Sequence, residues 1–277
     1  MALVLISSSL FRVTLAAGLA VFISIAAVNL RSNHQRNHCE AYLEAPAGVT
    51  LVAHAGGGLQ EGDYSNSKEA LDQSAANGLR LFELDFNWTG DGELAIVHDW
   101  TREYRYWHHL DWTDWMASHF VVPSSRRFHA STPRFDLTRL SLEALIEWLR
   151  TNPGRIITDI KSSNIEGLAL IASRAGPLQH RFVPQIYSAA EYDAVREMGY
   201  EDIILTTYRL SISPTSLREI DELDLFAVTV PENQVADAAN IISKNRIFTH
   251  TINAPVKLSV AGYYTDCLIP AETRNGV

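Results

Sequence analysis

Two carboxylates and a His-Asp pair lie within one stretch of the chain, RLFELDFNWTGDGELAIVHD, residues 80–99. If residues 81–88 form a β-strand, side-chain alternation puts Glu83 and Asp85 on one face and bulky apolar residues on the other. A surface strand would turn the two acids to water. A strand in a barrel covered by helices would instead point them into the barrel mouth, where unpaired charges require a cation. The TGDG turn and the apolar run after it would return the chain and bring His98 near both carboxylates.

A second candidate cluster follows the apolar run Val49–Ala53, where the sequence reads HAGGG from His54 onward. A histidine at the carboxyl end of a buried strand lies where barrel enzymes carry their catalytic groups. Gly56 and Gly57 would allow backbone amides to approach a bound anion, so we expect them to contact substrate. A flexible turn without a ligand is the alternative interpretation.

A third acid occurs in the strand-like segment RIITDIK, where alternation puts Asp159 and Lys161 on one face. The lysine alone would satisfy the acid as a simple ion pair. Three inward carboxylates from different strands fit a divalent-cation site better. We therefore expect Glu83, Asp85 and Asp159 to bind one metal ion.

The elements needed to position these residues alternate regularly along the chain. We expect strands at 49–53, 81–88, 94–97, 155–161, 182–187, 203–206, 225–230, 247–252 and 263–264, and helices at 68–78, 141–150, 166–174, 189–198, 215–220 and 232–243. Ser67 and Ser141 are expected N-caps. About eight strands alternating with helices predict an α/β fold, a (β/α)8 TIM barrel.

The composition fits one large domain and excludes one class of partner. A chain of 277 residues with 47% hydrophobic content has the length of a single α/β barrel. Its net charge of −9 provides no basic stripe, so we expect no nucleic-acid partner. Cys39 and Cys267 would form one bridge or remain as thiols, and the sequence leaves both open.

The first thirty residues predict a membrane segment. Residues 13–30 contain no charge and are flanked by Arg12 and Arg31. We expect a transmembrane anchor at 1–31, with a cleaved signal sequence as the alternative. A linker at 32–48 and a barrel at 49–277 would follow. The protein would then be a single-pass membrane protein with its barrel on the extracytoplasmic side, or secreted if the N-terminus is cleaved.

An aromatic-rich insertion interrupts the pattern at about 100–136. It contains four of the six tryptophans. Amphipathic aromatics at this density suit a lid over the site or a surface that contacts lipid head groups. A small separate core is an equally good explanation.

Taken in order, the motifs resemble those of the glycerophosphodiester phosphodiesterase family, a branch of the phospholipase C-like phosphodiesterase barrels. That family has His-Arg-Gly, an Asn-Thr pair, Glu-x-Asp, a Thr-x-Asp-Gly turn before His-Asp, Glu-x-Lys, Thr-Val-Asn and Thr-Asp. This chain has, in the same order, His54-Ala55-Gly56, Asn66-Ser67, Glu83-Leu84-Asp85, Thr89-Gly90-Asp91-Gly92, His98-Asp99, Asp159-Ile160-Lys161, Thr251-Ile252-Asn253 and Thr265-Asp266. The resemblance covers nearly the whole expected barrel.

The resemblance implies a metal-dependent phosphodiesterase that converts glycerophosphodiesters or lysophospholipids to an alcohol and glycerol phosphate. His54 and His98 would be the acid–base pair, Lys161 would contact the phosphate, and Mg²⁺ or Ca²⁺ would be the cation. In the family a neighbouring glycerol hydroxyl attacks first and forms a cyclic phosphate. Two positions depart from the pattern, because Ala55 replaces the phosphate-binding arginine and Asp159 replaces a glutamate.

Two alternatives follow from these departures. An Asp-x-Lys strand and a missing arginine also occur in sphingomyelinase D-like relatives, and a phosphatidylinositol phospholipase C-like enzyme would suit an insertion that contacts a bilayer. The lost arginine also fits an inactive barrel that binds a lipid head group or a protein.

Overall fold

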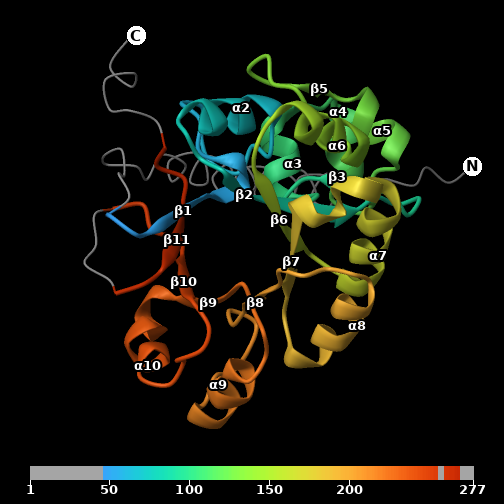
Figure 1. Ribbon diagram of the computed structural model, residues 1–277. Coiled ribbons are helices and arrows are strands. Elements are labelled where there is room, and N and C mark those ends of the chain that lie inside the picture. Colours follow the sequence, from blue (N-terminus) through green and yellow to red (C-terminus); the bar gives the residue numbers. More distant parts are fainter. Residues whose placement is uncertain (1–45, 255–258, 269–277) are drawn as a thin grey trace, which may run out of the picture. The chain divides into compact units, whose positions relative to one another are not determined.

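Eight parallel strands form a closed barrel in the computed structural model, which describes residues 46–254 and 259–268 (Figure 1). In ring order they are β1 (Thr50–Ala53), β2 (Leu81–Trp88), β6 (Arg155–Ile160), β7 (Phe182–Ile186), β8 (Ile204–Thr206), β9 (Ala227–Pro231), β10 (Ile247–His250) and β11 (Gly262–Thr265). The ring closes because β1 pairs with both β11 and β2. The predicted TIM barrel is confirmed.

A hairpin extends from β2. The short strand β3 (Leu94–Ile96) runs antiparallel to β2, with Phe86 opposite Ile96. In the turn between them, the Thr89 amide donates to the Glu93 carbonyl at 2.8 Å. Gly92 has a φ of 86°, which favours glycine there. The predicted return of the chain is confirmed.

The helices cover the outside of the barrel (Figure 1). They are α2 (Lys68–Ala76), α6 (Leu142–Thr151), α7 (Asn164–Ala175), α8 (Tyr192–Glu197), α9 (Pro214–Asp221) and α10 (Val235–Ala239), with the 3₁₀-helices η1 (His54–Gly56), η2 (Gly176–Arg181), η3 (Ala189–Glu191) and η4 (Glu232–Gln234). Ser67, Ser141 and Ser213 each accept a backbone amide at a helix N-terminus, so the two predicted caps are confirmed. Between β10 and β11, residues 251–254 and 259–261 contain no helix.

Two apolar layers hold the barrel together. Inside the ring, each of the eight strands contributes one buried side chain to a single layer: Val52, Leu81, Ile157, Val183, Ile204, Ala227, Phe248 and Tyr264. Outside the ring, alternate residues such as Phe82, Leu84 and Phe86 pack under the helices. The apolar face of β2 therefore packs under the helices, and the predicted two-faced character of this strand is confirmed.

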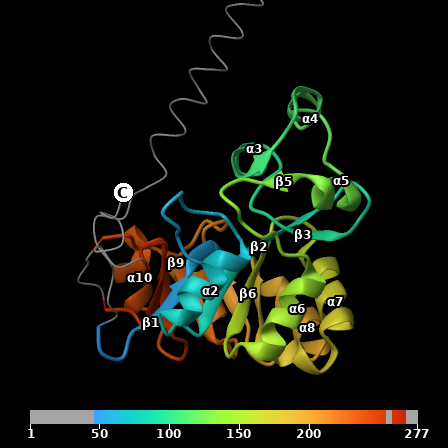
Figure 2. The same cartoon turned by 90° about the horizontal axis from the view of Figure 1, so that it is seen from above.

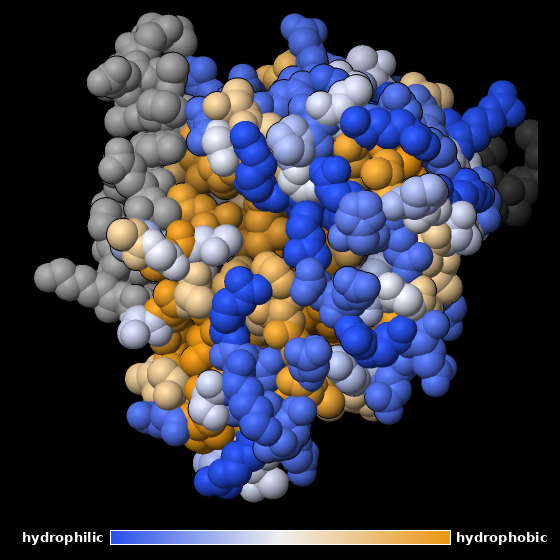
Figure 3. All heavy atoms as spheres, viewed as in Figure 1, coloured by the Kyte–Doolittle hydropathy of each residue, from blue (hydrophilic) through white to orange (hydrophobic). Residues whose placement is uncertain are grey.

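On the face of the molecule that the space-filling view shows, hydrophilic residues cover most of the surface and hydrophobic residues show between them (Figure 3).

The insertion folds on its own core beside β3 (Figure 2). Its elements are α3 (Arg102–Trp107), β4 (His108–His109), α4 (Trp112–Ala117), α5 (Ser125–Ala130) and β5 (Thr132–Pro133). Trp100, Tyr104 and Phe128 form a small buried cluster with Ala95 and Val97. The alternative of a separate core is confirmed. The insertion also carries six of the seven large apolar side chains that the described residues expose: Trp112, Met116, Phe120, Val121, Val122 and Phe135.

The predicted anchor at 1–31 and Cys39 lie outside the described residues. None of the helices in the described part of the chain has the length and apolar character that crossing a bilayer requires.

One buried histidine in the insertion makes stability depend on pH. His108 donates from Nδ1 to the Tyr104 carbonyl at 2.9 Å, and its Nε2 is buried without a partner among the described residues. Burial lowers the pKa of His108 from 6.5 to about 4. The unfolded chain therefore binds more protons between these two values. The stabilising contribution is fully present above pH 6.5 and is lost as the pH falls toward 4.

The free energy of unfolding should be lower at pH 4.5 than at pH 7. We predict that this difference is smaller in His108→Phe than in the original chain, by up to about 2–3 kcal/mol. The measurement is urea unfolding at both pH values. His109→Gln, at the exposed neighbouring position, is the control and should leave the pH dependence unchanged. An unaltered slope in His108→Phe would mean that other groups cause the acid sensitivity.

Candidate active site

A cavity of about 360 Å³ opens at the carboxyl ends of the strands. This is the end of the barrel at which enzymes of this architecture carry their sites. The residues that line the cavity are His54, Tyr64, Glu83, Asp85, His98, Asp159, Lys161, Gln185, Tyr208, Arg209, His250, Thr251 and Tyr264. All three predicted metal ligands, both predicted histidines and the predicted lysine are in this set.

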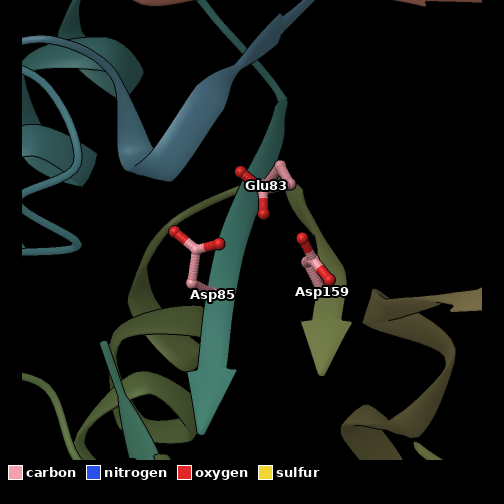
Figure 4. A group of neighbouring side chains, drawn as sticks. All are labelled: Glu83, Asp85 and Asp159. Atoms are coloured by element: carbon pink, nitrogen blue, oxygen red, sulfur yellow. The ribbon is translucent and has the colours of Figure 1, made fainter. Parts of the chain in front are cut away.

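The three acids come from neighbouring strands, Glu83 and Asp85 from β2 and Asp159 from β6 (Figure 4). In the parallel pairing of β2 and β6, Asp85 lies directly opposite Asp159. One oxygen from each of the three carboxylates lies within 4.8 Å of the others, and all three residues are buried. The structure therefore confirms that the three acids converge.

Backbone and side-chain donors fix the orientation of the two acids on β2. The Ala55 amide donates to Glu83 Oε2 at 2.8 Å, which uses one oxygen of that carboxylate. Asn66 donates from Nδ2 to Asp85 Oδ2 and accepts the Asp85 amide at Oδ1, both at 2.9 Å. Asn66 has a φ of 50°, a conformation that asparagine tolerates better than most residues.

Two tyrosines and a lysine surround Asp159. The Tyr187 hydroxyl donates to Asp159 Oδ1, and the Tyr208 hydroxyl lies 3.2 Å from Oδ2. Lys161 Nζ lies 2.5 Å from Asp85 Oδ1 and 2.8 Å from Asp159 Oδ2. Lys161 thus bridges two of the three acids. Burial alone would lower the pKa of Lys161, but Asp85 and Asp159 raise it above its ordinary value, so the lysine is charged.

The acids fit a divalent cation. Glu83 Oε1 is buried and has no hydrogen-bond partner among the described residues. Burial, followed by repulsion from Asp85, raises the pKa of Glu83 to about 8. A carboxylate that is crowded in this way and has one free oxygen is suited to metal coordination, and hard divalent ions prefer oxygen ligands. The donor set alone does not choose between Mg²⁺ and Ca²⁺.

His54 is held by an acid that directly follows the last strand of the barrel. Its Nδ1 donates to Asp266 Oδ1 at 2.8 Å, and its Nε2 lies 3.9 Å from Glu83 Oε2. Burial alone would lower the pKa of His54, but Asp266 raises it to about 10. Asn253 donates to the second oxygen of Asp266 at 2.7 Å. This contact links two of the family-like motifs near the end of the chain.

His98 has a similar arrangement on the hairpin. Its Nδ1 lies 3.0 Å from Asp99 Oδ2. The Tyr64 ring lies between the two histidines, with centroids 4.8 Å from His54 and 4.9 Å from His98. Each imidazole therefore has one nitrogen engaged by a carboxylate, and its Nε2 remains for chemistry in the cavity.

Gly56 and Gly57 are not among the residues that line the cavity, and the prediction that their amides contact an anion stays a prediction. The Gly57 amide donates to the His54 carbonyl at 2.7 Å. A Cβ on Gly57 would lie 2.2 Å from Ser74 Oγ, so glycine is needed there for packing against α2.

Several cavity residues had no clear signal in the sequence. Tyr64 and Arg209 lie in irregular segments, Tyr208 follows the short strand β8, and His250 is the last residue of β10. A search for polar residues at or just after the end of each strand would have found Tyr208 and His250. No local pattern marks Tyr64 or Arg209.

We predict that millimolar Ca²⁺ or Mg²⁺ raises the midpoint of thermal unfolding by about 5–10 °C, as expected for a ligand present at roughly 100 times its dissociation constant. In Glu83→Gln this rise should disappear, while the metal-free midpoint stays the same or increases because one crowded carboxylate is removed. Glu166→Gln, at an exposed position on α7, is the control and should retain the rise. An equal rise in Glu83→Gln would locate the ion elsewhere.

The chain is similar to solved structures of phosphodiesterases. No family model matches the sequence, and no curated protein matches it. A glycerophosphodiester phosphodiesterase from Parabacteroides distasonis has 17% identity and a TM-score of 0.62, and the match covers 83% of this chain and 97% of that one. A putative glycerophosphodiester phosphodiesterase from Galdieria sulphuraria has 12% identity and a TM-score of 0.57, with 83% and 96% covered.

A phosphodiesterase from Oleispira antarctica, solved in complex with the product sn-glycerol-3-phosphate, has 14% identity and a TM-score of 0.51, with 79% and 93% covered. At these identities the likeness concerns the fold. The chain thus shares the TIM-barrel fold of these glycerophosphodiester phosphodiesterase structures.

Proposed function

We propose that this protein is a metal-dependent phosphodiesterase that hydrolyses glycerophosphodiesters or lysophospholipids to an alcohol and glycerol phosphate. The observation that carries the proposal is the convergence of two histidine–aspartate pairs and a buried acidic triad on one cavity. The shared fold with phosphodiesterases, one of them holding sn-glycerol-3-phosphate, supports the same reaction class.

The two histidines divide the proton transfers. One Nε2 takes the proton of the attacking hydroxyl, and the other gives a proton to the oxygen of the leaving alcohol. Asp266 and Asp99 hold the rings through Nδ1, which orients each Nε2. When the neighbouring glycerol hydroxyl attacks, the alcohol leaves and a cyclic phosphate remains. Water then opens the ring in a second step, in which the two histidines exchange roles.

The cationic groups balance the charge of the phosphate. Glu83, Asp85 and Asp159 would hold the divalent ion, which when bound supplies positive charge to the non-bridging phosphate oxygens. Lys161 Nζ lies beside two of these acids and would donate to the same phosphate. Ala55 is fully buried, and its backbone amide donates to Glu83. The arginine of the family pattern therefore has no counterpart at position 55.

We also propose that the protein acts at a membrane, anchored by residues 13–30, with the barrel on the extracytoplasmic side. The uncharged run supports this, and so do the six apolar side chains that the insertion exposes. Within the insertion, residues 100–136, five arginines stand against four carboxylates, in a chain whose net charge is −9. A locally cationic surface with exposed aromatics suits an anionic bilayer.

The inactive-barrel alternative predicts binding without turnover. It would leave the oriented histidines without a role. The buried pair of His54 and Asp266, together with three buried acids, is costly to maintain at a cavity without a ligand or a reaction. We therefore retain this alternative as an outcome of the activity test.

We predict that the purified chain releases alcohol from glycerophosphodiesters with Mg²⁺ or Ca²⁺ and loses this activity with chelator. His54→Ala and His98→Ala should each lower kcat by about 10²–10⁴-fold, because each removes one proton-transfer group. The measurement is release of alcohol and of glycerol phosphate or its cyclic form, with lysophosphatidylcholine tested in parallel. His109→Ala is the exposed-histidine control. If no substrate turns over with any divalent ion while the protein is folded, the binding-module interpretation replaces this one.

We predict that the full chain sediments with membranes in high salt and that deletion of residues 13–30 releases it. A reporter enzyme that is active only outside the cytoplasm, fused after Val277, should be active in the full chain. An inactive reporter would reverse the orientation, and a soluble full chain would contradict the anchor.

A further inference from the structure

One wall of the cavity carries a stacked arginine that the reaction described above does not use. Arg209 follows β8, and its guanidinium carbon lies 3.8 Å from the Tyr187 ring centroid and 5.5 Å from that of Tyr208. Among the described residues, it is the one arginine that lines the cavity. We call Tyr187, Tyr208 and Arg209 the arginine wall.

The position of this cation is fixed beside the metal ligands. Arg209 Nη2 lies 4.0 Å from Asp159 Oδ1, and Nη1 lies 3.5 Å from the Lys161 carbonyl oxygen. The Tyr187 hydroxyl donates to Asp159 and to the Ile160 carbonyl, so the ring beneath the guanidinium is held as well. Stacking on a fixed ring orients the planar guanidinium and leaves its N–H groups for ligands in its plane.

The charges near the acids show what Arg209 adds. With a divalent ion bound and all three acids ionised, the carboxylates carry −3, and the ion together with Lys161 supplies +3. The charges of His54 and Asp266 balance each other. The metal site is therefore neutral without Arg209. Its guanidinium gives the cavity one additional positive charge, which a phosphodiester with its single negative charge would balance. A substrate that brings a cation of its own would leave this charge unbalanced.

The same stacking removes a surface that a quaternary ammonium group would need. Such cations are bound by open faces of aromatic rings. Arg209 covers Tyr187. The Tyr208 ring packs edge-on against His250, with centroids 5.4 Å apart, and also against Tyr187, at 6.0 Å. The wall therefore presents a cation where a choline-binding site would present bare aromatic faces.

We propose that the arginine wall selects phosphodiesters whose leaving alcohol is neutral or anionic, such as glycerol or inositol, and rejects those that carry choline or ethanolamine. This inference rests on the proposed phosphodiesterase function and narrows its substrate class. It also disfavours the sphingomyelinase D-like alternative, because those substrates carry choline.

The test compares kcat/KM of the full chain, with Ca²⁺ or Mg²⁺, for glycerophosphoglycerol and glycerophosphocholine. We expect the glycerol substrate to be preferred about tenfold or more. Arg209→Gln should bring this ratio close to one, and Arg209→Lys should keep most of it because the charge remains. A choline preference in the original chain, or an unchanged ratio in Arg209→Gln, would overturn the inference.

Arg246→Gln is the matched control. Arg246 also stacks on an aromatic ring, 3.9 Å from the Phe226 centroid, but it precedes β10 and lies outside the cavity lining. Its substitution should leave the substrate ratio unchanged. A loss of selectivity in both variants would indicate general damage to the barrel and would contradict a specific role for Arg209.

Equilibrium binding separates this inference from the proposed function. Calorimetry with sn-glycerol 3-phosphate and phosphocholine, in the presence of Ca²⁺, measures selectivity without turnover. If neither phosphodiester is hydrolysed, the proposed function fails. The inference still holds if glycerol phosphate binds more tightly than phosphocholine and Arg209→Gln removes the difference. Equal binding of the two ligands would refute it.

Discussion

The pairing of β2 with β6 is the constraint on which the site depends. Their parallel register sets Asp85 opposite Asp159, and Glu83 lies two residues earlier on β2. Like charges placed side by side in a buried position are unfavourable unless cations or donors compensate them. Lys161, the Asn66 amide group and the Ala55 amide all serve this purpose. Much of the cavity wall can therefore be understood as compensation for three acids.

Each strand of the barrel contributes one side chain that stabilises the interior and, two residues later, one polar side chain at the level of the cavity. One side chain from every strand forms the apolar layer inside the ring. Two positions further along, the residues are polar in all eight cases: His54, Glu83, Asp159, Gln185, Thr206, Thr229, His250 and Asp266. Because side chains alternate along a strand, these polar residues also face inward, above the apolar layer. The apolar layer fills the barrel next to the cavity, and its Tyr264 also lines the cavity.

Local patterns predicted the parts of this arrangement that local spacing determines. Alternation on β2 and β6 identified the three acids, and the TGDG turn predicted the return that brings His98 back. Ser67 and Ser141 marked helix starts for the same reason, since an N-cap acts within four residues.

Partners that meet only when the barrel closes were beyond local reasoning. Asp266 holds His54 across 212 residues of sequence, and Arg209 approaches Asp159 from another strand end. The glycines after His54 show a different limit of reasoning from the sequence. A glycine can be required because its amide approaches an anion or because a neighbouring side chain leaves no room for a Cβ. Here Gly57 packs against Ser74. Spacing alone does not separate these two uses.

Lys161 gives the site a resident counter-ion. Its ammonium bridges two of the three acids, Asp85 on β2 and Asp159 on β6. Without this bridge, the two carboxylates would face each other across adjacent strands with no cation between them. The same contact joins the side chains of β2 and β6 at the end of the barrel where the cavity opens. A divalent ion held by all three acids would have to share Asp85 and Asp159 with this ammonium, so the lysine would also limit where such an ion could lie.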